Sequence, residues 1–219
     1  LLDESRSSIG SLPGKEFGLK IVHPDILHKS GVGGVRLAKK SDIRTVAQKI
    51  LREVPKNFQK KTGSKLSGDP IGVLVMPKIE TPHDFGRELL CGLRLTREFG
   101  PVVTIGLGGL DTELFARELI RGRATISTSP ALSESSTRVE KTVSFRKLTG
   151  RSRDQFRSAS DAAISKLLEG FHEMALHYSP LNSRAPFWIT EFEVNPFLFA
   201  DGHAIPVDGL LRFQAPAPL

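Results

Sequence analysis

The residues best suited to metal chemistry stand near the end of the chain, in the stretch EFEVNPFLFADGHAIPVDG. Glu191, Glu193 and Asn195 occupy alternate positions of a predicted strand, so their side chains are expected on one face. A turn at Asp201-Gly202 should bring Asp208 opposite them on the returning strand. Carboxylate and amide oxygens gathered in this way suit Mg²⁺, which often shares its ligands with substrate phosphates. A solvated polar face of an edge hairpin is the alternative, and the largely apolar surroundings weigh against it.

An oddly placed lysine is the second feature. Lys20 stands between Leu19 and Ile21 at the start of the segment LKIVHPDILHKSGVGGV. Burying an ammonium group is costly unless it is paired, and a phosphate would supply the pairing as a point-charge contact. A lysine on the exposed face of an edge strand is the other interpretation, and the sequence leaves both open.

A glycine-containing loop follows that strand. His28 and Lys29 precede Gly33 and Gly34, and glycine lets backbone N–H groups approach an anion closely. The pattern therefore favours an anion-contacting loop. A tight turn would use the same glycines, and a lone histidine is more often structural than reactive.

A third stretch reads GRELLCGLRLTREFGPVVTIGLGG. Glu88 opens one predicted strand, Gly108-Gly109 ends the next, and Glu113 opens a predicted helix. The spacing by itself indicates a sheet with turns. The two glutamates are candidates to orient a lysine or to contact a nucleotide.

Composition narrows the class of protein. The 219 residues carry a net charge of +7 and one cysteine, Cys91, which excludes an internal disulfide and is expected to be a small buried residue. Scattered basic residues with one Trp and one Tyr give little support to nucleic-acid binding. No long apolar run predicts a membrane span, and no signal peptide is evident, so a cytoplasmic protein is expected. Walker-type, zinc and GxSxG motifs are missing from the sequence.

The chain predicts helices mixed with strands that run largely as hairpins, which favours α+β lobes over one doubly wound parallel sheet. Strands are predicted over 17–23, 35–38, 71–76, 87–95, 101–107, 187–194 and 203–213. Helices are predicted over 43–54, 111–120 and 154–177. The remaining predictions are an exposed loop over 55–69, a mobile loop over 125–138 and an extended segment over 142–148.

Three blocks, in this order, resemble ADP-forming acyl-CoA synthetases. LKIVHPDILHKSGVGGVRL resembles their VLKVVSPDILHKSDVGGVRL, and GRELLCGLRLTREFGPVVTIGLGG resembles their GREVIVGVTRDPQFGPVVMFGLGG. ITEFEVNPFLFADGHAIPVDGLLRF resembles their closing IAELDINPLLV stretch, which runs on to an Asp such as Asp208. The resemblance spans roughly residues 17 to 213 and extends to the beta chain of succinyl-CoA synthetase.

This resemblance implies an ATP-grasp fold of two α+β lobes with ATP or ADP held between them. The expected division is a loose segment over 1–16, a small lobe over 17–77, and a second lobe over 78–219 that carries the metal-binding hairpin. Lys20 would contact nucleotide phosphates, and Val75 and Met76 would lie at the adenine. The further residues expected at the ATP site are Gly33, Gly34, Glu88 and Glu113.

The resemblance also implies the metal ligands and the reactive group. Asn195 and Asp208 would bind Mg²⁺, with Glu193 nearby. His28 would be a second phosphohistidine, which relays phosphate between a histidine of a partner domain and ADP. Neutral imidazole is a suitable nucleophile for such a relay, and Mg²⁺ and lysine stabilise a phosphoryl group in transfer.

The sequence departs from the family at several points. Gly31 replaces an Asp, His23 replaces a Ser, and only about 16 residues precede the first predicted strand where the family has a longer helical segment. The domains that bind CoA and carry the first phosphohistidine are not in this sequence. An alpha-like partner domain or subunit is therefore expected to supply them, and to handle the acyl-CoA and the carboxylic acid.

Two functions remain in competition. The first is an ATP-grasp subunit or fragment of an acid–CoA ligase, and joint retention of Lys20, His28, Asn195 and Asp208 favours it. The second is a catalytically reduced nucleotide-binding or regulatory module, for example of an acyltransferase fusion, which Gly31 and the short N-terminal region favour. The acyl substrate, the choice between ATP and GTP, and the oligomeric state stay open at this stage.

Overall fold

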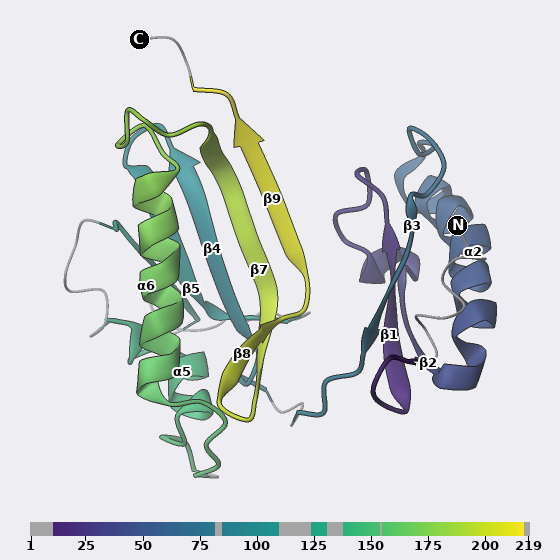
Figure 1. The fold of residues 1–219 in the computed structure, drawn as a ribbon, viewed down its shortest axis with the longest axis horizontal. Helices are drawn as coiled ribbons and strands as arrows, with labels where there is room; N and C mark the ends of the chain where they lie inside the picture. Colours follow the sequence, from purple (N-terminus) through teal and green to yellow (C-terminus); the bar gives the residue numbers. More distant parts are fainter. Residues whose placement is uncertain (1–10, 82–84, 110–123, 131–137, 154, 217–219) are drawn as a thin grey trace. The chain divides into compact units, whose positions relative to one another are not determined.

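The computed structural model describes residues 11–81, 85–109, 124–130, 138–153 and 155–216. The chain divides into two compact units, Leu1–Ile79 and Glu80–Leu219. In each unit, helices cover one face of an antiparallel sheet (Figure 1). The combination matches the α+β class expected from the sequence.

The first unit holds a three-stranded sheet in the order β2-β1-β3. Its elements are β1 (Glu16–Val22), η1 (Ser30–Val32), β2 (Val35–Lys39), η2 (Lys40–Asp42), α2 (Ile43–Thr62) and β3 (Gly72–Pro77). Alternate residues of β1, namely Phe17, Leu19 and Ile21, are fully buried in one cluster with the apolar stripe of α2. Because strand side chains alternate between faces, Lys20 must point away from α2.

Helix α2 is longer than predicted. The loop expected over 55–69 is wrong for residues 55–62, because the helix continues through Pro55 to Thr62. Contacts on the second half offset the cost of an interior proline. Asn57 Nδ2 donates to the Val32 carbonyl at 3.0 Å, and Lys61 Nζ donates to the Gly31 carbonyl at 3.4 Å.

The second unit is built on a six-stranded sheet. The strand order is β6-β5-β4-β7-β8, and β9 also pairs with β7. Its elements are β4 (Leu89–Thr96), β5 (Gly100–Leu107), β6 (Thr125–Thr128), α5 (Val143–Leu148), α6 (Asp161–His177), β7 (Trp188–Ala200), β8 (His203–Pro206) and β9 (Gly209–Gln214). Helices α5 and α6 cover the same face of this sheet (Figure 1).

The core of the second unit lies between α6 and the sheet. Ile164, Leu168, Phe171 and Ala175 recur at helical spacing on α6 and are all buried. Phe171 stacks on Phe192 of β7 with ring centroids 5.2 Å apart. Cys91 of β4 is buried among these residues, as the sequence predicts, and burial raises the pKa of its thiol well above the usual range.

Several boundaries in the second unit differ from the predictions. Residues 143–148 form α5 rather than an extended segment, because Thr142 caps the helix by accepting a hydrogen bond from the Phe145 N–H. Helix α6 begins at Asp161, later than predicted. The Ser160 hydroxyl caps this start by accepting a hydrogen bond from the Ala163 N–H. Residues 125–128 pair with β5 as β6 instead of forming a loop. The helix predicted over 111–120 lies outside the described residues.

Within the described residues, no helix combines the length and the apolar character that crossing a membrane requires.

Candidate functional site

Asn195 lies at an irregularity in β7. Cys91 of β4 pairs with Val194, but Leu89 pairs with Phe197, so β7 has two residues where β4 has one. Such a bulge re-aims side chains and is frequent beside functional sites. Here the Asn195 side-chain oxygen accepts a hydrogen bond from the Gly109 N–H at 2.8 Å.

Asp208 lies directly opposite Asn195. The Asn195 N–H donates to the Asp208 carbonyl at 2.9 Å, and the Val207 N–H donates to the Pro196 carbonyl at 3.0 Å. Both Asn195 and Asp208 are half-buried. The predicted meeting of the two residues across the closing hairpin is therefore confirmed for their backbones.

Glu88 joins the same region through the turn after β5. The Gly108 N–H donates to the Glu88 carbonyl at 2.8 Å, and a Cβ on Gly108 would lie 2.7 Å from the Leu89 carbonyl carbon. Gly109 has φ +91°, and a Cβ there would collide with the Glu88 carboxylate. The chain can approach Glu88 and Leu89 this closely only because Gly108 and Gly109 have no side chains. The Glu88 carboxylate therefore lies beside Gly109, whose N–H binds Asn195.

Glu191 and Glu193 have different surroundings, although they share a strand face. Glu191 lies 2.9 Å from Arg212 and 3.6 Å from Arg94, so its carboxylate is committed to a ladder of ion pairs across β4, β7 and β9. Glu193 pairs with Gly92, whose missing side chain leaves room for it. Glu193 therefore lies across from a residue without a side chain, whereas Glu191 lies between two arginines.

The donor chemistry of this region fits a hard cation that is shared with phosphate. Among the described residues, no group of three or more His, Cys, Asp or Glu side chains is placed to hold a metal by itself. Mg²⁺ is usually held by one or two carboxylates together with substrate phosphates. An amide oxygen has two lone pairs, so Asn195 can accept from Gly109 and still face a cation.

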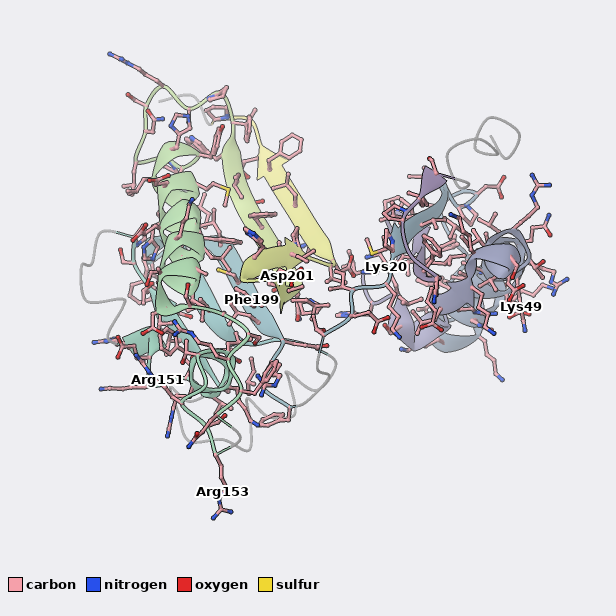
Figure 2. The ribbon with its side chains drawn as sticks, turned by 60° about the horizontal axis from the view of Figure 1, so that its bottom comes forward. Lys20, Lys49, Arg151, Arg153, Phe199 and Asp201 are labelled. Carbon is pink, nitrogen blue, oxygen red and sulfur yellow. The ribbon has the colours of Figure 1, made fainter. Side chains whose placement is uncertain are left out.

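Lys20 is only 7% exposed and lies on β1, the central strand of its sheet. Its cross-strand neighbours are Val35 and Leu74. Figure 2 shows Lys20 and Lys49 on opposite sides of the first unit, with Lys49 on the α2 side. The interpretation of Lys20 as an exposed residue of an edge strand is therefore wrong.

The glycine loop uses its amides internally. The Gly33 N–H donates to the Ser30 carbonyl at 3.1 Å, and the Gly34 N–H donates to the Lys29 carbonyl at 2.8 Å. A Cβ on Gly34 would lie 2.6 Å from Cγ2 of Ile21. These glycines close a tight turn against β1, so their predicted role as phosphate-binding amides gains no support from the hydrogen bonds.

Side chains of α2 hold this loop in place. Arg36 Nη2 lies 2.6 Å from Glu53 Oε2, and Arg36 Nε donates to the Gly33 carbonyl at 3.3 Å. The hydrogen bond from Arg36 holds the pKa of Glu53 below its usual range. The loop is therefore fixed to the helix rather than free-standing.

The two histidines of the loop differ. His23 is buried, and its Nδ1 accepts a hydrogen bond from the Asp25 N–H at 3.1 Å. A backbone hydrogen bond from Ser67 lowers the pKa of Asp25. His28 is exposed. His23 thus supports the turn that precedes His28.

Gly31 has no side chain and so leaves room for the ammonium group of Lys61. A Cβ on Gly31 would collide with the Lys61 ammonium group, which also donates to the Gly31 carbonyl at 3.4 Å. Where the resembled family has a carboxylate, this chain therefore places a lysine amine beside the loop.

Val75 and Met76 point to opposite faces of β3. Val75 pairs with Leu19 and packs against the core of the first unit. Met76 pairs with Gly18, where a Cβ would lie 3.6 Å from the Met76 side chain. Met76 therefore shares the face of Lys20, whereas Val75 can offer only its backbone there. Glu113 lies outside the described residues.

Comparison with known proteins decides the family. Residues 7–213 match the family described as "ATP-grasp domain". The chain belongs to this ATP-grasp family. The two compact units described above are therefore parts of an ATP-grasp chain.

The relatives of this ATP-grasp domain are ligases. It is 26% identical to the beta subunit of the ADP-forming acetate–CoA ligase I of Pyrococcus furiosus over 87% of the chain and 72% of that subunit. It is 34% identical to ADP-forming acetate–CoA ligase I of Archaeoglobus fulgidus over 52% of the chain. The matched region spans only 15% of that ligase.

Solved structures share the fold. A dinucleotide-forming acetyl-coenzyme A synthetase from Ca. Korarchaeum cryptofilum matches 98% of the chain and 82% of its own length, with TM-score 0.68 and 24% identity. A protein from Pyrococcus horikoshii matches 99% of the chain and 82% of its own length, with TM-score 0.68 and 21% identity. Both confirm the ATP-grasp fold.

Sequence reasoning missed two residues of this ATP-grasp domain. Gly109 stood out only as the end of a strand, yet its N–H binds Asn195. Arg87, the arginine of the GRE triplet, was not among the predicted site residues and is only 4% exposed. A positively charged side chain at the first position of the predicted strand 87–95 was the available signal, because arginine is almost never buried without partners.

Proposed function

We propose that this chain is the ATP-grasp subunit or part of an NDP-forming acyl-CoA synthetase, and that it transfers phosphate between ATP/ADP and a phosphohistidine with Mg²⁺. The observation that carries the proposal is the hydrogen bond from Gly109 to Asn195, which gathers Asn195, Asp208 and Glu88 at one place. Ligase relatives and the nucleotide-binding family support the same function.

In the second unit, Asn195 and Asp208 would hold the cation, and Glu193 would stand beside them. Bound Mg²⁺ would neutralise charge on the phosphates. The neighbouring synthetase structure described as a complex with Mg-AMPPCP supports the choice of cation and nucleotide. Gly109 would keep the Asn195 oxygen in place by fixing the amide.

In the first unit, Lys20 would bind the phosphates. Its buried side chain lies on the face of the sheet that Met76 shares, on the side away from α2. The edge strand β3 would bind the base. The Lys78 N–H donates to the Glu16 carbonyl in the register of the β1–β3 ladder. Along an antiparallel pair, every second residue directs its N–H and C=O groups away from the partner strand. In this register the Val75 backbone groups point away from β1, so they are available to an adenine edge.

His28 would be the acceptor. Its imidazole is exposed at the end of a turn that β1, His23 and α2 hold in place. As a ring nitrogen forms the P–N bond, the P–O bond to ADP breaks and ADP leaves with that electron pair. The ring then releases a proton to water, and the reverse steps return the phosphoryl group to ADP.

An alpha-like partner would complete the reaction. The chain spans 15% and 24% of the two Archaeoglobus fulgidus ligases that it matches. The P. furiosus relative is named as a beta subunit. CoA, the acyl group and the first phosphohistidine would accordingly belong to the partner.

Phosphate transfer to His28 can be tested directly. The chain would be mixed with Mg²⁺, radiolabelled ATP and an alpha-like partner domain of the P. furiosus type, and the protein examined for acid-labile, base-stable phosphate. We expect label on the wild-type chain and none on His28→Ala. His203→Ala is the matched control, because His203 is an exposed histidine on β8. Equal label on wild type and His28→Ala would refute the relay.

A reduced, nucleotide-binding module is the second candidate. The observation that favours it is Lys61, whose amine lies where the family carboxylate would begin at Gly31. In that case the chain binds Mg²⁺–nucleotide through Asn195, yet no label reaches His28 with any partner. The same labelling experiment, combined with nucleotide titration, separates the two candidates.

A further inference from the structure

A buried arginine stands immediately before β4. Arg87 is 4% exposed, and arginine is almost never buried without partners. Its Nη1 donates to the Lys147 carbonyl at 3.3 Å and to the Phe156 carbonyl at 3.2 Å. Its guanidinium carbon lies 4.6 Å from the centroid of the Phe156 ring, a cation–π contact.

These contacts join β4 to α5 and to the loop that follows it. Lys147 is in the last turn of α5, where the helix dipole favours a cation. Phe156 belongs to the loop between α5 and α6, which is closed by a bridge between Thr149 and Arg157. Gly86 packs on α5 as well, because a Cβ there would lie 3.0 Å from Cγ of Lys147.

The next residue along the chain is Glu88, which reaches the proposed metal site. Its carbonyl accepts from the Gly108 N–H at 2.8 Å and from the Ser144 hydroxyl at 3.5 Å. Its carboxylate lies against Gly109, and the Gly109 N–H binds Asn195. A continuous set of contacts therefore runs from the Arg87 guanidinium to the Asn195 side chain.

We propose that Arg87 is a positioning residue for the metal–nucleotide site. It fixes α5 and the following loop behind Glu88, and this holds the Glu88 carboxylate and the Gly109 amide in the arrangement that orients Asn195. The inference rests on the proposed function, because it takes Asn195 as a metal ligand. Lysine cannot replace Arg87, since its compact ammonium group on a shorter side chain cannot lay a planar cation over the Phe156 ring while one nitrogen reaches both carbonyls.

The test compares Arg87→Lys with Arg151→Lys. Arg151 also lies over a ring, with its guanidinium carbon 5.2 Å from the Phe145 centroid, and it pairs with Asp161, but it contacts none of the site residues in the described structure. Arg151 follows α5 in the chain and is labelled in Figure 2. ADP affinity would be measured by calorimetry on the full chain, once with Mg²⁺ and once with EDTA. The ratio of the two affinities is the magnesium gain.

The expected result is a magnesium gain about tenfold smaller in Arg87→Lys, the scale found when residues that support metal ligands are changed. ADP affinity in EDTA should stay within about twofold of wild type, since the residues proposed to bind ADP itself are intact. Arg151→Lys should match wild type in both measurements. A wild-type magnesium gain in Arg87→Lys, even with a lower Tm, would mean that Arg87 is structural alone and would overturn the inference.

Asn195→Ala separates failure of this inference from failure of the proposed function. If Asn195→Ala abolishes the gain while Arg87→Lys keeps it, only the inference fails. If Asn195→Ala keeps the gain, the metal site is elsewhere and both fail. Should Arg87→Lys not fold, Phe156→Leu removes the ring but keeps both carbonyl bonds. We expect its gain to fall about threefold, as loss of one cation–π contact implies, and a wild-type gain would overturn the inference.

Discussion

The N–H of Gly109 and the side-chain oxygen of Asn195 are joined across 2.8 Å, although the two residues stand 86 positions apart in the chain. Gly109 follows the end of β5, and Asn195 lies at the bulge of β7. The bond therefore links two strands that are not neighbours in the sheet, since β4 lies between them. It also fixes which atom of the amide faces Gly109.

Gly109→Ala should damage both stability and metal binding. Gly109 has φ +91°, and a methyl group there would meet the Glu88 carboxylate. A non-glycine residue in such a conformation costs about 1–3 kcal/mol. Urea unfolding should show a loss at the upper end of that range, and the magnesium gain in ADP affinity should be lost.

Gly100→Ala is the matched control for that variant. Gly100 also has a positive φ, +66°, but a Cβ there would meet no atom within 4 Å. It should show the backbone cost of about 1 kcal/mol or more with an unchanged magnesium gain. An equal loss of magnesium gain in both variants would contradict a specific role for Gly109.

Glu191→Gln should leave the magnesium gain unchanged, whereas Glu193→Gln should reduce it. Glu191 is occupied by Arg94 and Arg212 on an exposed sheet face, and such exposed pairs contribute about 0–1 kcal/mol to stability. Calorimetry with ADP in Mg²⁺ and in EDTA checks both variants. A reduced gain in Glu191→Gln alone would reverse the assignment of the two glutamates.

The sequence predicted the framework of the site because hairpin geometry is local. Asp201-Gly202 forms the turn of β7 and β8, and Asp208 meets Asn195 as the alternation implied. Lys20 was identified as unusual for a sound physical reason, the cost of a buried ammonium. The structure adds that β1 is the central strand, which removes the edge-strand alternative.

Other parts depended on contacts between distant residues, which spacing does not contain. An exposed loop was predicted from residue 55, but Asn57 and Lys61 bond to the loop before β2 and the helix continues. The amides of Gly33 and Gly34 looked available, and the structure commits both to carbonyls of their own turn. The role of Arg87 follows from carbonyls 60 and 69 residues away, which no local pattern reveals.

Gly31→Asp should be tolerated and should form an ion pair with Lys61. The atom in the way of a new Cβ is the far end of the Lys61 side chain, which can move. An exposed pair of this kind contributes about 0.2–1 kcal/mol. A double-mutant cycle with Lys61→Met, followed by urea unfolding, should give a coupling energy in that range.

Gly31→Asp also helps to distinguish an active ligase subunit from a catalytically reduced nucleotide-binding module. If the carboxylate of the family supports the histidine, Gly31→Asp should increase the acid-labile label on His28. Unchanged label together with a measurable coupling to Lys61 would show that the carboxylate has no part in the transfer.

Stability of the second unit should fall in mild acid because of His172. Burial lowers the pKa of His172, and Glu169 partly opposes this; Nε2 lies 3.1 Å from the Thr128 hydroxyl. A histidine with a lowered pKa in the folded state binds its proton more weakly there than in the unfolded chain, where the pKa is about 6.5. Protonation therefore favours unfolding, and the stabilising contribution is lost as pH falls below about 6.5.

Urea unfolding of wild type and His172→Gln at pH 7.5 and pH 5.5 checks this sign. The wild type should lose more free energy of unfolding between the two pH values than His172→Gln does, since the glutamine cannot titrate. Equal losses would show that His172 does not contribute to the pH dependence.

The central claim is that Asn195 and Asp208 lie at the metal of a bound nucleotide. Mn²⁺ prefers the same oxygen ligands as Mg²⁺ and broadens the NMR signals of nearby amides. In a titration of the full chain with Mn²⁺ and ADP, we expect the amide signals of Gly109, Asn195 and Asp208 to broaden first, with Arg151 unaffected. Removal of the effect by Asn195→Ala would complete the result. Broadening centred on other residues, with these three signals unchanged, would contradict the account.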